Sequence, residues 1–226
     1  GNNAGPMDEV AKRINKISDK YLSLQNHLDT VAPLLTSPPD RTLHFTDENQ
    51  QEMEIPIRSK VLAHASPVFA IAFESPMEEG KTDESYKLQD EPIRKDAVKA
   101  FVHWCEYLEL PTVPGDDDTW DLNLQDELSL MNFANEKMVW PLLNFVAEAI
   151  MNRLTEGDDF REEDLFQILT AVDFLEDSVD HAHNLGALRE VCIKWVAEPE
   201  NFERFAGLMS AGDADDAFCK LSEELR

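Results

Sequence analysis

Apolar residues near the start of the chain recur every three or four positions, which is typical of the seam of an amphipathic helix. The seam consists of Val10, Ile14, Ile17, Tyr21, Leu24, Leu28 and Val31. Pro33, Pro38 and Pro39 then predict the end of the helix and a stiff connector. Three heptads are marginally stable alone, so we expect the seam to be buried on its own domain or against a second copy of the chain.

The pattern then changes to the alternation that is typical of strands. Leu43 and Phe45 alternate with polar residues, and the apolar residues of segment 53–57 do the same beyond a polar turn. This predicts a hairpin with one buried face, in which Pro56 makes the second strand an edge or ends it. Two short helices over 59–65 and 67–73 and a short strand over 86–88 are predicted next.

Helical periodicity dominates the rest of the chain. One helix follows Pro92 and carries Ala97, Phe101 and Cys105. The later predicted helices cover residues 127–137, 141–154, 162–177, 186–197, 200–208 and 213–225. The favoured boundary between a mixed first domain and an all-helical tail is the polar segment Gly157–Asp159. The predicted fold class is therefore α+β and helix-rich.

Charge narrows the range of partners. Acidic residues number 46 against 20 basic ones, which gives a formal net charge of −26. Such a field repels phosphate, so we expect no nucleic-acid partner and no anionic membrane surface as a partner. Residues 111–226 hold 27 of the acidic side chains and 8 of the basic ones. This acidic half either forms a solvated surface or faces a partner with a basic surface.

The cysteines and the motifs predict a soluble intracellular protein, cytoplasmic or nuclear, without enzymatic chemistry. Cys105, Cys192 and Cys219 lack the spacing of a disulfide framework, and no apolar run approaches the roughly 20 residues of a membrane span. The chain has no glycine-rich phosphate loop, nucleophile elbow or Cys-x-x-Cys pair, so no catalytic residue and no cofactor is predicted. The segment Asp180–His183 could offer two imidazoles to Zn²⁺, but it lacks a third ligand; we interpret it as a polar helix end and predict no metal site.

Several segments resemble the motifs of BTB/POZ domains, in the order that the family has. Asp40–Phe45 is similar to the opening strand Asp-Val-x-Leu-x-Val. Ile57–Phe69 resembles Val-His-Lys-x-Val-Leu-Ala-x-x-Ser-x-x-Phe, with Arg58-Ser59 in place of the His-Lys pair. Leu88–Asp90 and Ala100–Tyr107 resemble Leu-x-Asp and Ala-Phe-x-x-Leu-x-x-Tyr. Leu130–Asn135 is similar to Leu-Leu-x-x-Ala-Asp.

The resemblance covers residues 38–154, and the chain also resembles the fungal BTB group. Residues 1–6 precede Met7 and are interpreted as a cloning remnant. The rest of the chain is predicted to have three parts: 7–37 as an N-terminal amphipathic helix with its proline-rich connector, 38–154 as a BTB/POZ-like core with a small sheet capped by helices, and 155–226 as an all-helical C-terminal extension.

The resemblance further implies a homodimeric protein-interaction adaptor. Many family members recruit substrates to cullin ubiquitin ligases; the alternative is a dimeric scaffold or transcription-linked regulator without cullin. In long-form members a helix before the first strand forms the dimer interface, which assigns the seam from Val10 to Leu28 to that role. Cullin-binding members often carry a hydrophobic-x-acidic motif before the Leu-Leu-x-x-Ala helix, and Leu124 and Asp126 fit it. Alternatively, these two residues begin the helix or pack on the core.

Some BTB domains also use a charged pocket for partner peptides. The aspartate of the first strand and a nearby basic residue form that pocket, and the resemblance assigns these places to Asp40 and to Arg58 or Lys60. We expect partner binding there, with the changed His-Lys pair as the main departure from the family pattern.

Overall fold

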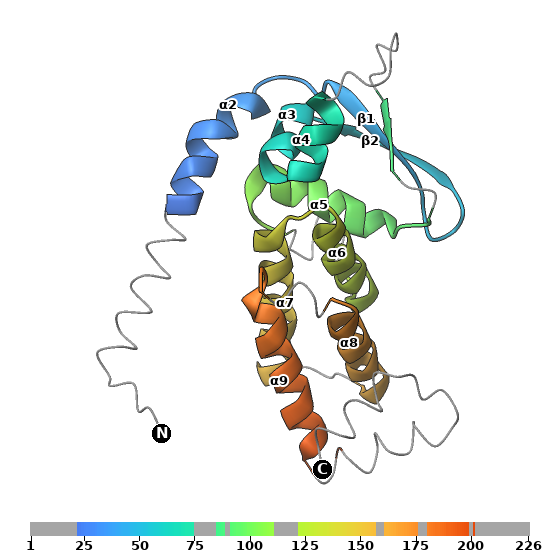
Figure 1. The fold of residues 1–226 in the computed structure, drawn as a ribbon. Coiled ribbons are helices and arrows are strands. Elements are labelled where there is room, and N and C mark those ends of the chain that lie inside the picture. The colour runs from blue at the N-terminus through green and yellow to red at the C-terminus, as the bar shows by residue number, and fades with distance from the viewer. Residues whose placement is uncertain are drawn as a thin grey trace.

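The computed structural model describes residues 22–74, 85–88, 91–110, 122–156, 161–175, 180–198 and 201. Their fold is helix-rich with a small mixed sheet, and is compatible with the α+β class. Residues 22–30 are helical, and the elements that follow are α2 (Ala32–Leu35), β1 (Arg41–Thr46), β2 (Glu52–Ile57), α3 (Ser59–Ala65), α4 (Pro67–Glu74), β3 (Ser85–Lys87), α5 (Lys95–Tyr107), α6 (Leu124–Glu136), α7 (Trp140–Glu156), α8 (Glu162–Phe174) and α9 (His183–Ala197) (Figure 1).

The described strands form a sheet in the order β2-β1-β3. β1 and β2 pair antiparallel, with Leu43 opposite Ile55 and Phe45 opposite Met53. This confirms the hairpin, because the alternating apolar residues of both strands fall on one face. β3 pairs with β1 in parallel, which places Tyr86 beside Leu43 on the same face.

Aromatic side chains join the sheet to the helices at one end of the molecule. The Phe69 ring of α4 lies 5.7 Å from the Tyr86 ring of β3 and 6.0 Å from the Phe101 ring of α5. Phe101 in turn meets Phe133 of α6 edge to face at 4.8 Å. Such pairs contribute about 0.5–1.5 kcal/mol each beyond the burial of their surface. The cluster therefore fixes α4, α5 and α6 relative to the sheet.

The helices of the predicted tail pack on the predicted first domain. α9 lies along α7 (Figure 1), and Asn184 bonds Asn144 twice, through its N–H at 2.9 Å and its side-chain amide at 3.0 Å. Leu165 and Ile168 of α8 and Leu188 of α9 belong to the same buried cluster as the sheet residues. For α8 and α9 the chain therefore has one continuous core. Residues 202–226, which include most of the last two predicted helices, lie outside the described residues.

Several element boundaries differ from the sequence prediction. α6 begins at Leu124 rather than near residue 127, because Asn123 and Asp126 form a capping box that starts the helix earlier. α8 ends at Phe174 instead of residue 177, and α9 begins at His183 instead of residue 186. Pro33 lies in the first turn of α2, where proline is tolerated because that N–H has no helical partner.

Candidate interaction surfaces

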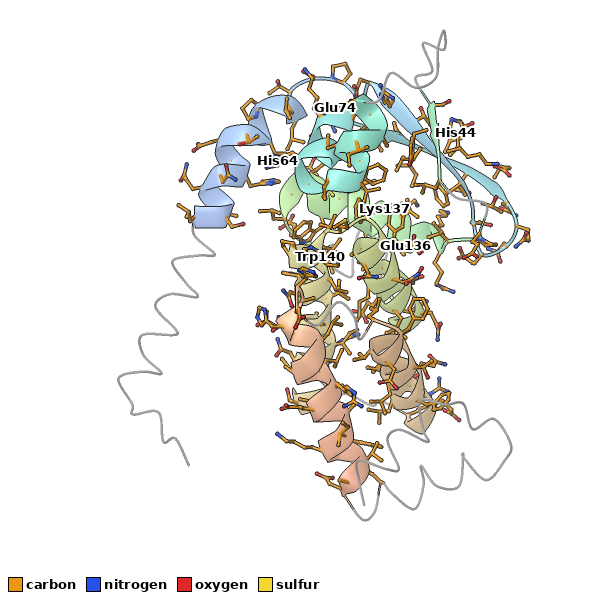
Figure 2. All side chains as sticks on the ribbon, viewed as in Figure 1. His44, His64, Glu74, Glu136, Lys137 and Trp140 are labelled. Carbon is orange, nitrogen blue, oxygen red and sulfur yellow. The ribbon has the colours of Figure 1, made fainter. Side chains whose placement is uncertain are left out.

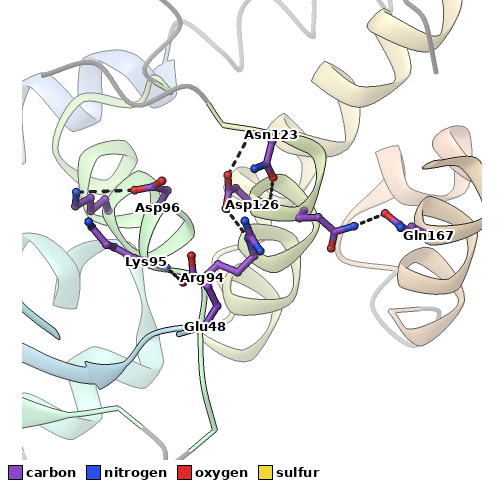
Figure 3. Close-up of polar contacts among 9 residues, drawn as sticks. Glu48, Arg94, Lys95, Asp96, Asn123, Asp126 and Gln167 are labelled. Carbon is purple, nitrogen blue, oxygen red and sulfur yellow. Dashed lines mark hydrogen bonds and ion pairs between the residues drawn. The ribbon is translucent and has the colours of Figure 1, made fainter. Parts of the chain in front are cut away.

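The first turn of α6 holds one of the two segments for which partner binding was predicted. Asp126 accepts a hydrogen bond from the N–H of Asn123 at 3.1 Å, and Asn123 accepts one from the N–H of Asp126 at 3.0 Å. The Asp126 carboxylate also lies 2.6 Å from Nε of Arg94, and its side chain is 3% exposed (Figure 3). Each oxygen of this carboxylate thus has a partner within the chain.

The neighbouring acid is held in a similar way. Glu127 pairs with Arg153 of α7, and its side chain is largely buried. Leu124 is half-buried and packs against the core. The expected loop position of Leu124 and Asp126 is therefore wrong: both begin α6, as the alternative interpretation has it. Cullin contact by this segment stays a prediction, and the side chain of Asp126 is already engaged.

A groove opens beside this turn, between α6 and α8. It has a volume of about 420 Å³ and is lined mainly by Leu128 of α6 and by Phe166 and Phe174 of α8. Phe174 is 77% exposed, an unusual state for a large aromatic side chain. At the rim, Gln125 of α6 donates to Gln167 of α8 (Figure 3). We call this surface the α6–α8 groove.

Asn132, one of the residues that line the α6–α8 groove, has a polar atom without a partner in the described part of the chain. Asn132 donates its amide to Glu136 at 3.1 Å, but its buried Oδ1 accepts no hydrogen bond from any described residue. A groove that exposes large apolar side chains is the kind of surface that binds another chain. Sequence reasoning missed the groove. Leu165, Ile168, Leu169 and Val172 form the buried face of α8, and Phe166 and Phe174 lie off that face.

The predicted charged pocket is divided between two separate contacts. Asp40 accepts hydrogen bonds from the N–H of Ser59 at 2.7 Å and from its hydroxyl at 2.5 Å. Arg58 instead donates to the carbonyl of Ser37 at 2.8 Å and pairs with Glu106 at 2.6 Å. Desolvation acts to raise the pKa of Asp40, but the Ser59 hydrogen bonds outweigh it and lower the pKa. Asp40 therefore caps α3, while Arg58 ties the start of α3 to α5.

The predicted dimer seam is described only at its end. Val10, Ile14, Ile17 and Tyr21 lie outside the described residues. Leu24 and Leu28 are 46% and 52% exposed. The helix attaches to the body through the last residue of the apolar pattern, Val31, which is fully buried, and through His27, whose Nε2 lies 2.8 Å from the carbonyl of Glu106. Leu24 and Leu28 thus remain exposed for contact with another surface.

The histidine pair and two of the three cysteines lie in the described part of the chain. The ring of His181 stacks on Trp140 at 4.9 Å, and His183 begins α9. Within the described ranges, no three His, Cys, Asp or Glu side chains are grouped as metal ligands. Burial raises the pKa of Cys105, and it raises the pKa of Cys192 to about 12, which favours the protonated thiol at both positions. Cys219 lies outside the described residues.

No family model matches the chain, and the curated protein sequences contain no match to it. Among the described helices, none combines the length and the apolar character that a bilayer crossing requires.

Proposed function

We propose that this chain is a protein-interaction adaptor of the BTB/POZ type that acts as a homodimer. The observation that carries the proposal is the α6–α8 groove with its exposed Phe174. Surfaces of this kind expose apolar area at a cost in solubility, and that cost is offset when a partner covers them.

The order of the elements supports the BTB/POZ assignment. A hairpin precedes the helix pair α3–α4, and β3 then adds to β1 in parallel before α5, α6 and α7. The motif serine of the resemblance, Ser66, is fully buried, and its hydroxyl donates to the carbonyl of Lys137 at 2.6 Å. A residue that joins two segments 71 positions apart has a structural reason to be part of the motif.

We further propose a cullin as the partner at the α6–α8 groove. The groove lies beside the first turn of α6, where the resemblance implies cullin contact, and Gln125 belongs to both. Phe174 would be the apolar anchor, because it is the most exposed large apolar side chain among the described residues.

The test is titration of the full chain with a purified cullin N-terminal domain. Phe174→Asp should weaken binding by about 30-fold, since loss of an anchor costs about 2 kcal/mol. Ile71→Asp is the matched control, because Ile71 is 72% exposed on α4, outside the groove, and its change should leave the affinity unaltered. Absence of binding by the wild type, or equal losses in both variants, would remove the cullin proposal. Asp126 is unsuitable for this test, because its replacement breaks an internal ion pair.

The alternative function is a dimeric scaffold or transcription-linked regulator without cullin. The exposure of Leu24 and Leu28 supports a homodimer under both functions. Light scattering at tens of micromolar should give a dimer, which Leu28→Asp should disrupt because a charge in the seam would be desolvated. Leu22→Asp changes an exposed residue of the same helix outside the seam, and should leave the dimer intact. A monomeric wild type would contradict dimerisation.

A further inference from the structure

The last described helix, α9, lies next to α8, which forms one wall of the α6–α8 groove (Figure 1). Beyond Ala197, where α9 ends, the side-chain amide of Asn201 donates to the carbonyl of Trp195 at 3.0 Å. This bond holds the last described residue to the final turn of α9. The 25 residues that follow in the sequence, 202–226, therefore leave the body at a defined place.

The sequence after Asn201 contains an amphipathic segment, the predicted helix 213–225, which lies outside the described residues. Its apolar residues recur at steps of three, one, three and four, which places them on one stripe of a helix: Ala214, Ala217, Phe218, Leu221 and Leu225. The acidic residues of the segment fall outside this stripe. A helix of 13 residues is marginally stable alone, so an apolar stripe of this kind needs a surface to cover it.

The α6–α8 groove matches that stripe in polarity and lies within its reach. Phe174 and Leu128 face the groove, and none of its described lining residues is charged. The linker between Asn201 and the predicted helix, residues 202–212, has eleven residues and spans up to about 36 Å when extended. α8 has 13 residues and is about 20 Å long, so the linker is long enough to place the helix anywhere along it.

We propose that residues 213–225 of the same chain occupy the α6–α8 groove, with Phe218 and Leu221 packed against Phe174 and Leu128. Occupation of the groove in the free protein does not require a cullin. Its regulatory consequence rests on the proposed function: a partner has to displace the C-terminal segment before it can reach Phe174. Such competition lowers the apparent affinity of the partner in proportion to the fraction of chains whose groove is open.

The native Cys219 allows a test in the full chain. On a helix over 213–225 it lies about 100° from Phe218 and outside the apolar stripe, so a nitroxide label on its thiol leaves the stripe free. Cys105 and Cys192 are buried, and mass spectrometry checks that each chain carries one label.

Methyl signals of the ¹³C-labelled chain report where the nitroxide lies. We expect it to broaden the signals of Leu128 and Leu175 in the α6–α8 groove, because nearby nitroxides speed the relaxation of nuclear spins. Ile71 is the reference, since it is 72% exposed on α4 and does not line the groove, and its signal should keep its intensity.

Substitutions on both sides of the contact make the result specific. Phe218→Asp places a charge in the apolar stripe and should restore the intensity of the groove signals, because that charge would be desolvated in the groove. Phe174→Asp should restore them from the side of the groove. Ser210→Asp adds the same charge in the linker and should leave the broadening unchanged. Unaltered methyl signals from the buried core show that each variant is folded.

Equal broadening of the Ile71 and groove signals, or groove signals of full intensity, would overturn the proposal. A mixture of nitroxide-labelled chains without ¹³C and ¹³C-labelled chains without nitroxide should show no broadening. Broadening in the mixture would assign the occupant to a second copy and also overturn the proposal. If the groove signals are broadened but neither the wild type nor Phe218→Asp binds the cullin N-terminal domain, the cullin proposal fails and occupation of the groove by residues 213–225 is supported.

Discussion

The two sides of α6 differ in how their polar and apolar groups are used. On the side of its first turn, Asp126 and Glu127 are buried and paired with Arg94 and Arg153. On the side that faces α8, Phe174 is exposed across the groove and Asn132 Oδ1 has no described partner. The buried ion pairs on the first side stabilise the fold. The exposed aromatic side chain on the second side is available for contact with a partner. One helix can therefore provide rigidity and a binding surface at once, and substitutions should separate the two roles.

The largest expected effect is at the paired side. Asp126→Ala removes a buried carboxylate that caps α6 and faces Arg94, and should lower the free energy of unfolding by about 3 kcal/mol. Urea denaturation followed by circular dichroism measures this. Gln125→Ala, one residue earlier on the exposed surface, serves as the control and should change stability by less than about 0.5 kcal/mol. Similar stability of the two variants would show that the first turn of α6 is not a structural anchor.

A smaller effect is expected where the N-terminal helix meets α5. His27→Ala removes the hydrogen bond to the carbonyl of Glu106 and should lower the free energy of unfolding by about 1 kcal/mol. Because this contact lies at the edge of the body, the loss should appear mainly as local opening. Hydrogen exchange of residues 22–30 should then become faster while exchange in α7 is unchanged. Uniform acceleration along the chain would contradict this local role.

The junction of α6 and α7 allows a test in alkaline solution. Lys137 is buried, with its ammonium 5.8 Å from the Phe69 ring and 5.2 Å from the Phe133 ring, and desolvation lowers its pKa (Figure 2). A base with a lowered folded-state pKa destabilises the fold while it is charged in both states, and this cost fades as the pH rises towards the unfolded pKa of about 10.5.

Lys137→Met keeps a long apolar side chain between the two rings and removes the charge. At pH 7 we expect the variant to be as stable as the wild type or more stable by up to about 1 kcal/mol. Urea denaturation between pH 7 and 10.5 should show this difference shrinking as the wild-type lysine loses its proton. A difference that is constant with pH would mean that the charge of Lys137 carries no cost in the folded protein.

The smallest effect on stability is expected at the open side. Phe174→Asp replaces an exposed side chain, so the free energy of unfolding should change by less than about 0.5 kcal/mol even though partner binding is expected to be lost. Thermal unfolding of the full chain provides the measurement. A large loss of stability would place Phe174 in the core and remove it as an anchor.

Local patterns account for the parts of the fold that the sequence predicted. The alternation at Leu43 and Phe45 determined the buried face of the hairpin, because a strand repeats every two residues. The start of α6 could also have been predicted from the sequence, since Asn123 and Asp126 have the spacing of a capping box. The pairing of Arg94 with Asp126 could not be predicted, because it joins residues 32 positions apart and depends on how α5 and α6 pack. The α6–α8 groove depends on packing in the same way.

The hairpin has a consequence for how copies of this chain meet in crowded solution. Among the described strands, β2 and β3 are the edges of the sheet, and exposed edges can recruit strands from other molecules into aggregates. β3 has three residues, too few to guide a long pairing. β2 carries exposed Glu52 and Glu54, and its Pro56 cannot donate a hydrogen bond. Both edge strands therefore disfavour aggregation through pairing with strands of other molecules. Specific contacts between molecules are then expected on the helical surfaces.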